Sequence, residues 1–513
     1  MYRLKCNFVL PKKLIPKIDS IMMKKFLLLL IGVCGMMCPL RAQASTADVM
    51  IAINDTIQMP LSTIISKNLP VICVETVDNV EPSCEIVPAP PGAWGSTSNS
   101  PKLPGRIVMY KRINGVDSVV YDSGDYEEDK SGMRIKIRGN TSARADKKPY
   151  KIKLEKKYDL LFRGDESTYK DKDWLLLNDE YLLTTTAFRI CKMVGMPWVP
   201  GCEYVNLIIN GRYRGFYLLC ESVKRNEKCR LNVDKDWGFI FECDLYWWNE
   251  PVYVTSYQAP SYNYTFKYPD EDDITVDQLA YMQILVNEFE TILNTENYAD
   301  MIDVHSFAAW SLVHDIMGTK DGGGCNRFYT KYDTTAESKI MMPVAWDFDL
   351  AERSGNDWSR CHQVYMNQLF NNPNRAFVGE FVRLWCRIRE SFRADITAEL
   401  NVFLNSTMGR AVEASFPIDN ITWSHGSRLF DRYVSGHILW FWSRYDWLDG
   451  SIMALHVPND INFDGVVNVS DVTELIGGVL GYNEVYQVID DVNGDNDVNV
   501  ADVTALIQLI LNN

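Results

Sequence analysis

The segment between residues 321 and 350 carries the pattern that decides the fold. It opens with the sequence DGGGCN at 321–326 and closes with WDFDL at 346–350. The two stretches between these motifs, 327–332 and 339–346, are rich in aromatic and aliphatic residues and are predicted to be strands. Carboxylates and an amide therefore stand at the ends of two neighbouring strands, where side chains from separate elements can meet.

The chain around this segment has a β-rich half followed by a helix-rich half. Hairpins are predicted at 106–121 and 204–220, each turning at an Asn-Gly pair, whereas 88–104 is predicted to be a loop because it is rich in Pro, Gly and Ser. Beyond residue 275, apolar residues recur mostly at helical spacing. We therefore predict an α+β fold with a β-rich N-terminal region at 45–130.

Phosphoryl transfer is a reaction that these residue types could serve. It needs cations on the phosphates, carboxylate and amide oxygens on magnesium, and a carboxylate beside the attacking hydroxyl. Asp321 and Asn326 have the D-x4-N spacing of a kinase catalytic loop, and Asp347 ends the next strand, where a magnesium-binding aspartate would stand. Upstream, RGNTS at 138–142 and KKPYKIKL at 147–154 supply cations. Each motif is weak alone, but together they favour a kinase-type site.

Together these motifs resemble the spore-coat protein H (CotH) kinase family. The most specific parts are RGNTS and WDFDLA, and the resemblance covers most of a domain that we expect at 131–450. It implies an atypical protein-kinase-like fold that uses ATP with Mg²⁺ or Mn²⁺. The sequence departs from ordinary protein kinases in two places. No G-x-G-x-x-G loop precedes the first strands, and Thr319-Lys320-Asp321 stands where H-R-D would.

The resemblance implies catalytic and metal-binding roles for four residues of the segment 321–350. Asp321 would be the catalytic aspartate, although a plain turn residue is the alternative. Asn326 and Asp347 would hold the metal, and Asp349 would be a further metal ligand or a structural cap. If the strand ends between the two aspartates, only Asp347 need point into the site.

It also implies a nucleotide-binding role for four upstream residues. Lys148 or Lys151 would contact the phosphates, with Arg138 nearby, and Glu221 would pair with the lysine or hold a second metal. The alternative for Arg138 and Lys148 is that they balance acidic neighbours.

A second pattern is repeated after residue 458. The sequence DINFDGVVNVSD at 460–471 recurs 31 residues later as DVNGDNDVNVAD at 491–502. Calcium takes six or more oxygen ligands from a flexible loop. Positions 1, 3, 5 and 12 of each repeat carry side-chain oxygens, and position 7 offers a carbonyl. Position 6 needs a positive φ, which Gly465 adopts freely and Asn496 tolerates. An apolar helix is predicted after each loop.

This repeat resembles the dockerin family, whose members bind cohesin modules of scaffold proteins through the helices that follow the loops. We predict a small all-α dockerin domain at 458–513 with two Ca²⁺ ions. It has ten Asp and Glu residues and neither Lys nor Arg, so folding should need the metal. The predicted ligands are Asp460, Asn462, Asp464, Val466 and Asp471 in the first loop, and Asp491, Asn493, Asp495, Asp497 and Asp502 in the second.

The start of the chain predicts export. Residues 1–44 are interpreted as an over-called start followed by a signal peptide: Lys24-Lys25, an apolar run at 26–33 and the exit Ala42-Gln43-Ala44. The alternative is a buried helix or a membrane anchor, but no later segment is long and apolar enough to span a bilayer. We expect a secreted protein, extracellular or held at the cell surface through a cohesin.

Charge and cysteine content narrow the choice of partners. The net charge of −15 argues against nucleic acid as a partner. Ten cysteines follow residue 44 without a C-x-x-C pair, so a zinc cluster is not expected. The local pairs 73/84, 191/202 and 220/229 are candidate disulfides, and buried free thiols are the alternative of equal weight.

Three functions fit the sequence. The first is a secreted kinase that phosphorylates Ser or Thr on extracellular or surface proteins, and the second is a catalytically silent binding or scaffold protein with the same fold. The third is a carbohydrate-active protein of a polysaccharide-degrading cellulosome, suggested only by the dockerin. That activity calls for paired carboxylates across a sugar cleft, and no convincing pair is found. The cluster Tyr246-Trp247-Trp248 could stack on sugar or pack in the core.

Overall fold

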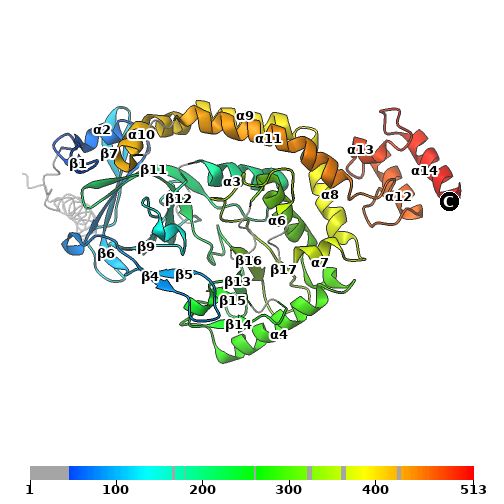
Figure 1. Cartoon of the computed structure of the whole chain (residues 1–513), viewed down its shortest axis with the longest axis horizontal. Helices are drawn as coiled ribbons and strands as arrows, with labels where there is room; N and C mark the ends of the chain where they lie inside the picture. The colour runs from blue at the N-terminus through cyan, green and yellow to red at the C-terminus, as the bar shows by residue number, and fades with distance from the viewer. Residues whose placement is uncertain are drawn as a thin grey trace, which may run out of the picture. The chain divides into compact units, whose positions relative to one another are not determined.

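The computed structural model describes residues 45–164, 168–179, 181–258, 261–319, 326–359, 365–424 and 429–512 (Figure 1). The chain divides into two units, Met1–Val49 and Met50–Asn513, and the second contains all the elements described below. The predicted leader, residues 1–44, lies outside the described residues. None of the helices in the described ranges is long and apolar enough to cross a membrane.

The N-terminal strands and the strands of the central region form one large sheet. Its order is β10-β9-β8-β6-β3-β11-β12-β1-β2, with β7 paired to β6. Because β10 also pairs with β12, seven strands close into a ring that encloses an apolar core. The strands are β1 (Met50–Ala52), β2 (Gln58–Pro60), β3 (Val71–Thr76), β6 (Leu103–Ile113), β7 (Val116–Asp122), β8 (Met133–Ile137), β9 (Tyr150–Tyr158), β10 (Asp171–Leu177), β11 (Cys202–Ile209) and β12 (Arg212–Glu221).

Both predicted hairpins are present in this sheet. β6 and β7 turn at Asn114 and Gly115, whose φ angles are 51° and 80°, and β11 and β12 turn at Asn210 and Gly211, with φ angles of 49° and 72°. Two successive residues with positive φ define the tight turn that matches the twist of paired strands. The local turn chemistry therefore fixed the register of both hairpins.

The region 88–104, predicted as a loop, contains a strand. β4 (Glu85–Pro88) pairs with β5 (Ser96–Asn99) as a separate two-stranded hairpin. The sequence of β5 is STSN, which has no apolar alternation. Polar contacts hold this strand in place, and pattern analysis cannot detect them.

A second sheet and the helices make up the rest of the central domain, which confirms the mixed α+β prediction. This sheet has the order β14-β15-β13-β16-β17, and the long helices α9 and α11 lie side by side (Figure 1). The strands are β13 (Phe239–Asp244), β14 (Tyr253–Thr255), β15 (Asn263–Tyr268), β16 (Arg327–Lys331) and β17 (Ile340–Met341). The helices are α2 (Leu61–Ile65), α3 (Leu183–Val194), α4 (Val276–Ile292), α5 (Tyr298–Met301), α6 (Val304–Met317), α7 (Met366–Phe370), α8 (Ala376–Arg389), α9 (Phe392–Asn405), α10 (Thr407–Trp423) and α11 (Phe430–Met453).

The C-terminal segment has a helix after each repeated loop, as predicted. These helices are α12 (Val469–Val479) and α14 (Val500–Asn512), with the short α13 (Gln487–Asp490) between them. Leu475 and Leu506, which are 31 residues apart, are both buried in the apolar core.

All eight cysteines in the described ranges are free thiols. The register of β11 and β12 places Cys202 directly opposite Cys220, a pairing that sequence spacing did not suggest. Burial raises the pKa of the Cys202 thiol to about 12. Burial also raises the pKa of Cys220, so both thiols stay protonated at neutral pH, as expected of structural rather than reactive cysteines.

A buried ion pair fastens α10 to the large sheet and gives a stability prediction. Lys147 Nζ lies 2.7 Å from Asp419 Oδ1, and both side chains are 2% exposed. Replacing Lys147 by Met should leave the Asp419 carboxylate buried without its cation and lower the free energy of unfolding by about 3–5 kcal/mol. Urea denaturation would measure this loss.

Two further variants separate charge from packing. The double variant Lys147→Met/Asp419→Asn should recover most of the lost stability, because no unpaired charge remains buried. Lys157→Met, on the exposed end of β9, should change little. If the double variant is as unstable as the single one, the loss comes from packing and not from the charge.

Candidate functional site

Asn326 and Asp347 meet at the ends of the strands that the sequence analysis singled out. The Asn326 side-chain amide donates a hydrogen bond to Asp347 Oδ2 over 2.7 Å. Asn326 directly precedes β16, and Asp347 follows the extended stretch after β17. The two strands are paired antiparallel, which brings together side chains 21 residues apart.

The backbone at both positions is in the left-handed region. The φ angles are 70° at Asn326 and 65° at Asp347. A residue other than glycine in this conformation costs free energy, and such residues are concentrated at functional sites. The surrounding structure therefore holds the backbone at both positions in a conformation that Asn and Asp tolerate better than most residues.

Glu242 and Lys267 complete the surroundings of this pair and were not singled out from the sequence. The backbone N–H of Asn326 donates to Glu242 Oε1 over 2.8 Å, and Lys267 Nζ lies 3.0 Å from Glu242 Oε2. Glu242 is buried within β13. Two acidic residues, Glu242 and Asp244, in an otherwise apolar strand, FIFECD, were the signal that could have identified it.

The charges around Asp347 are unbalanced toward negative. Burial and, after it, the nearby Asp349 raise the pKa of Asp347 to about 7, although Arg138 and the hydrogen bond from Asn326 oppose the rise. Burial lowers the pKa of Arg138, while the carboxylate of Asp347 acts to raise it. The raised pKa means that the ionised form of Asp347 is disfavoured, and a nearby cation would stabilise that form. These residues therefore fit a divalent metal.

A cavity of about 300 Å³ lies between the two sheets, and its lining has seven cationic and five acidic side chains. Like charges face each other directly across β8 and β9, where Arg134 pairs with Lys153 and Lys136 with Lys151. Such pairs repel each other, and a bound anion would relieve the repulsion. The cations lining the cavity are Lys102, Arg134, Lys136, Lys151, Lys153, Lys224 and Lys267. Lys267 thus contacts both the cavity and the Glu242–Asn326 cluster.

The two candidate phosphate-binding lysines lie in different places. Lys151 lines the cavity and pairs with Asp173 at 3.0 Å, and burial lowers its pKa. Lys148 Nζ donates to the carbonyl oxygens of Ala143 and Ala145, at 2.9 and 3.1 Å, and so secures the loop before β9.

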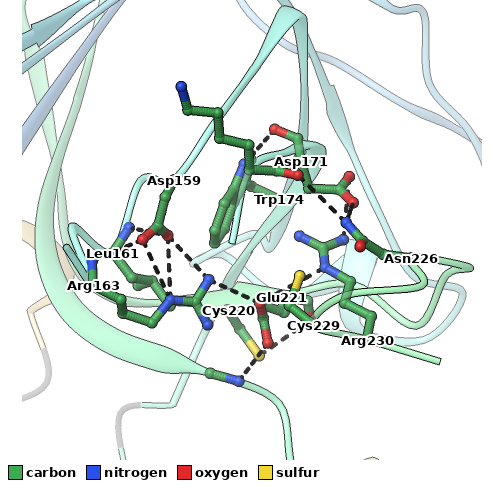
Figure 2. Close-up of polar contacts among 12 residues, drawn as sticks. Asp159, Leu161, Arg163, Asp171, Trp174, Cys220, Glu221, Asn226, Cys229 and Arg230 are labelled. Carbon is green, nitrogen blue, oxygen red and sulfur yellow. Dashed lines mark hydrogen bonds and ion pairs between the residues drawn. The ribbon is translucent and has the colours of Figure 1, made fainter. Parts of the chain in front are cut away.

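Glu221 lies in a separate buried cluster of charges. Figure 2 shows its carboxylate between Arg163 and Arg230, with distances of 2.9 and 3.8 Å. Its second oxygen accepts the backbone N–H of Gly201 over 2.8 Å. Arg230 in turn lies 3.4 Å from Asp171. The structure therefore brings Glu221 to two arginines and not to Lys148 or Lys151.

The two remaining predicted residues are Asp321 and Asp349. Asp321, the predicted catalytic aspartate, lies outside the described residues. Asp349 is exposed beside Asp347. In the described ranges, no group of three or more His, Cys, Asp or Glu side chains is arranged to hold a metal ion. Magnesium in nucleotide sites commonly uses one or two protein carboxylates together with substrate phosphates, which agrees with the pair found here.

The two C-terminal loops have the same hydrogen-bond pattern. Asp460 accepts the N–H groups of residues 464 and 465, and Asp491 accepts those of 495 and 496, with matching distances of 3.0 and 2.8 Å. Gly465 and Asn496 have φ angles of 90° and 69°, which confirms the backbone conformation predicted for position 6.

The last acidic residue of each loop accepts two backbone N–H groups at equivalent positions. Asp471 accepts N–H groups of Asn462 and Asn468, and Asp502 accepts those of residues 493 and 499, at 2.8–3.1 Å. The loops are therefore closed by the first and last of the predicted calcium ligands.

Comparison with known proteins identifies the central region. The family model described as CotH kinase protein matches residues 135–415, more than half of the chain. The match includes Arg138, Glu242, Asn326 and Asp347. No curated protein matches the sequence.

Proposed function

The chain belongs to the CotH kinase protein family, and from this we propose that it transfers the γ-phosphoryl group of ATP to Ser or Thr hydroxyls of extracellular or surface proteins. The observation that carries the proposal is the Asn326–Asp347 pair, close to a cavity in which seven cations outnumber five carboxylates. Phosphoryl transfer needs this combination of metal-binding oxygens and phosphate-binding cations.

Each residue of the site has a proposed role. Asp347 and Asn326 would hold Mg²⁺ or Mn²⁺, which neutralises phosphate charge when bound. Glu242 orients Asn326 through its backbone N–H. Lys151 and Arg138 would attract the phosphates, and Asp321 would accept the proton of the acceptor hydroxyl.

We propose that residues 458–513 form a dockerin that binds two Ca²⁺ ions and a cohesin. Apolar side chains are exposed on both helices at positions that repeat every 31 residues. Val469 and Val500 are 71% and 69% exposed, and Leu480 and Leu511 are 62% and 79% exposed. Two similar exposed apolar faces suit a protein partner. With the predicted leader, they favour a secreted kinase attached to a scaffold.

Labelled ATP tests the catalytic proposal. The full chain, incubated with γ-labelled ATP, Mg²⁺ or Mn²⁺ and a Ser-rich protein, should transfer label to Ser or Thr. Asp321→Ala should lower the rate by at least about 10²-fold, because general base catalysis is lost. Asp395→Ala, on the exposed surface of α9, should transfer normally.

Two outcomes would count against this assignment. Transfer that survives Asp321→Ala would exclude Asp321 as the catalytic base. Binding of ATP without any transfer would favour a catalytically silent binding protein with the same fold.

A further inference from the structure

The hairpin β4–β5 lies outside the family-matched region and contacts two segments that adjoin the site, residues 139–140 and 246–249. Thr97, in β5, is the centre of these contacts. The Asn249 side-chain amide donates to Thr97 Oγ1 over 2.7 Å, and the Thr97 hydroxyl donates to Asn140 Oδ1 over 2.8 Å. One hydroxyl thus accepts from one residue and donates to another, and a chain of this kind strengthens each bond.

Neighbouring residues of the hairpin contact the same two segments, at residues next to Asn140 and Asn249. Ser98 Oγ donates to the carbonyl oxygen of Gly139 over 2.5 Å. On the other side, the Trp248 indole N–H donates to the carbonyl oxygen of Trp94 over 3.2 Å, and the Trp94 ring packs edge-on against Tyr246 at 5.9 Å. The cluster Tyr246-Trp247-Trp248 therefore serves in part to seat this hairpin.

The two partners of Thr97 are close in sequence to residues of the candidate site. Asn140 is two residues after Arg138, on the loop between β8 and β9. Asn249 ends the short turn that follows β13, the strand that carries Glu242. The hydrogen bonds of Trp94 and Thr97 with Trp248 and Asn249 place the β4–β5 hairpin beside the turn that follows β13. The Thr97 hydroxyl therefore joins the loop of Arg138, from the large sheet, to an extension of the small sheet.

We propose that Thr97 is a positioning residue for the phosphate- and metal-binding site. By tying Asn140 to Asn249, it fixes the Arg138 loop against the strand that orients Asn326. Arg138 is the cation that offsets the charge of Asp347, so its placement controls how well the site accepts metal and phosphate together. This inference rests on the proposed function.

Isosteric variants of Thr97 test the proposal in the full chain. Thr97→Val keeps the shape but removes both hydrogen bonds, and Thr97→Ser keeps the hydroxyl. A hydrogen bond of ordinary net strength corresponds to roughly a three- to tenfold change in an equilibrium constant. We expect Thr97→Val to weaken Mn²⁺–ATP binding, measured by calorimetry, by roughly this factor. Thr97→Ser should bind like the wild type.

Two controls separate positioning from general destabilisation. Thr295→Val removes an exposed hydroxyl bond outside the site and should leave the affinity unchanged. Asn249→Ala should weaken binding like Thr97→Val, and the double variant should be no weaker than either single one, because both break the same chain of bonds. Additive losses, or a Thr97→Val variant with wild-type affinity, would overturn the proposal.

Hydrogen exchange gives a readout that does not depend on the proposed function. In the absence of nucleotide, amides of residues 139–146 should exchange faster in Thr97→Val than in the wild type and in Thr97→Ser. If the wild type binds no Mn²⁺–ATP, the proposed function fails, and unchanged exchange in Thr97→Val would independently overturn the positioning role.

Discussion

Replacing Asp347 by Asn should abolish phosphoryl transfer and remove the thermal stabilisation by Mn²⁺–ATP. The asparagine can still accept the hydrogen bond from Asn326, so the local geometry is kept while the charge that would hold the metal is lost. We expect the transfer rate to fall by roughly 10³-fold or more, on the order of 4 kcal/mol of transition-state stabilisation. Label transfer and thermal melting, each with and without Mn²⁺–ATP, measure the two effects.

In the metal-free protein, Asp347→Asn should stabilise the fold at neutral and alkaline pH. Because burial and Asp349 raise the pKa of Asp347 to about 7, the folded state binds its proton more tightly than the unfolded chain does. Ionising Asp347 therefore destabilises the wild type progressively between about pH 4 and pH 7. Asp347→Asn avoids this cost, so in metal-free buffer at pH 8 it should melt no lower than the wild type, and the advantage should vanish near pH 4.

The matched control is Asp395→Asn on exposed α9, which should change neither transfer nor melting. Asp347 is not a metal ligand if Asp347→Asn keeps the full Mn²⁺–ATP stabilisation. A lower melting temperature of the metal-free variant would instead indicate that the carboxylate is structural.

Features set by local sequence were predictable, and those set by long-range contacts were not. The two Asn-Gly hairpins and the positive φ of Gly465 follow from the residues at those positions. By contrast, Glu242 reaches Asn326 across 84 residues of chain, and Thr97 reaches Asn249 across 152. No spacing rule relates residues so far apart.

The sequence also could not show which of two adjacent lysines, Lys147 or Lys148, is buried. Lys147 and Lys148 are adjacent and chemically identical, and only Lys148 was considered for the phosphates. The structure buries Lys147 against Asp419, and Lys148 secures its own loop through two carbonyl groups. Which lysine faces inward depends on α10, whose position the local sequence does not encode. Of the two candidate lysines, Lys151 lines the cavity, and it was a candidate through the resemblance to the CotH family.

Calcium removal should unfold the C-terminal repeat of the full chain while leaving the CotH domain folded. Ten acidic groups without a basic one repel each other, and bound ions would offset that repulsion. In excess chelator we expect the amides of α12 and α14 to lose their protection against hydrogen exchange, while those of β8 and β13 keep theirs. Added Ca²⁺ should restore protection, whereas Mg²⁺ at the same concentration should not.

The double variant Asp464→Ala/Asp495→Ala distinguishes a calcium-binding role from a purely structural one. Both residues accept a backbone N–H within their own loop, from Val466 and Asp497 respectively. If they act only through these bonds, the variant should be less stable with and without calcium. If they bind calcium, the variant should lose protection of α12 and α14 in Ca²⁺ and bind no cohesin. In chelator it should be no less folded than the wild type, because it carries two fewer repelling charges. Full protection of α12 and α14 in the chelated wild type would contradict metal-dependent folding.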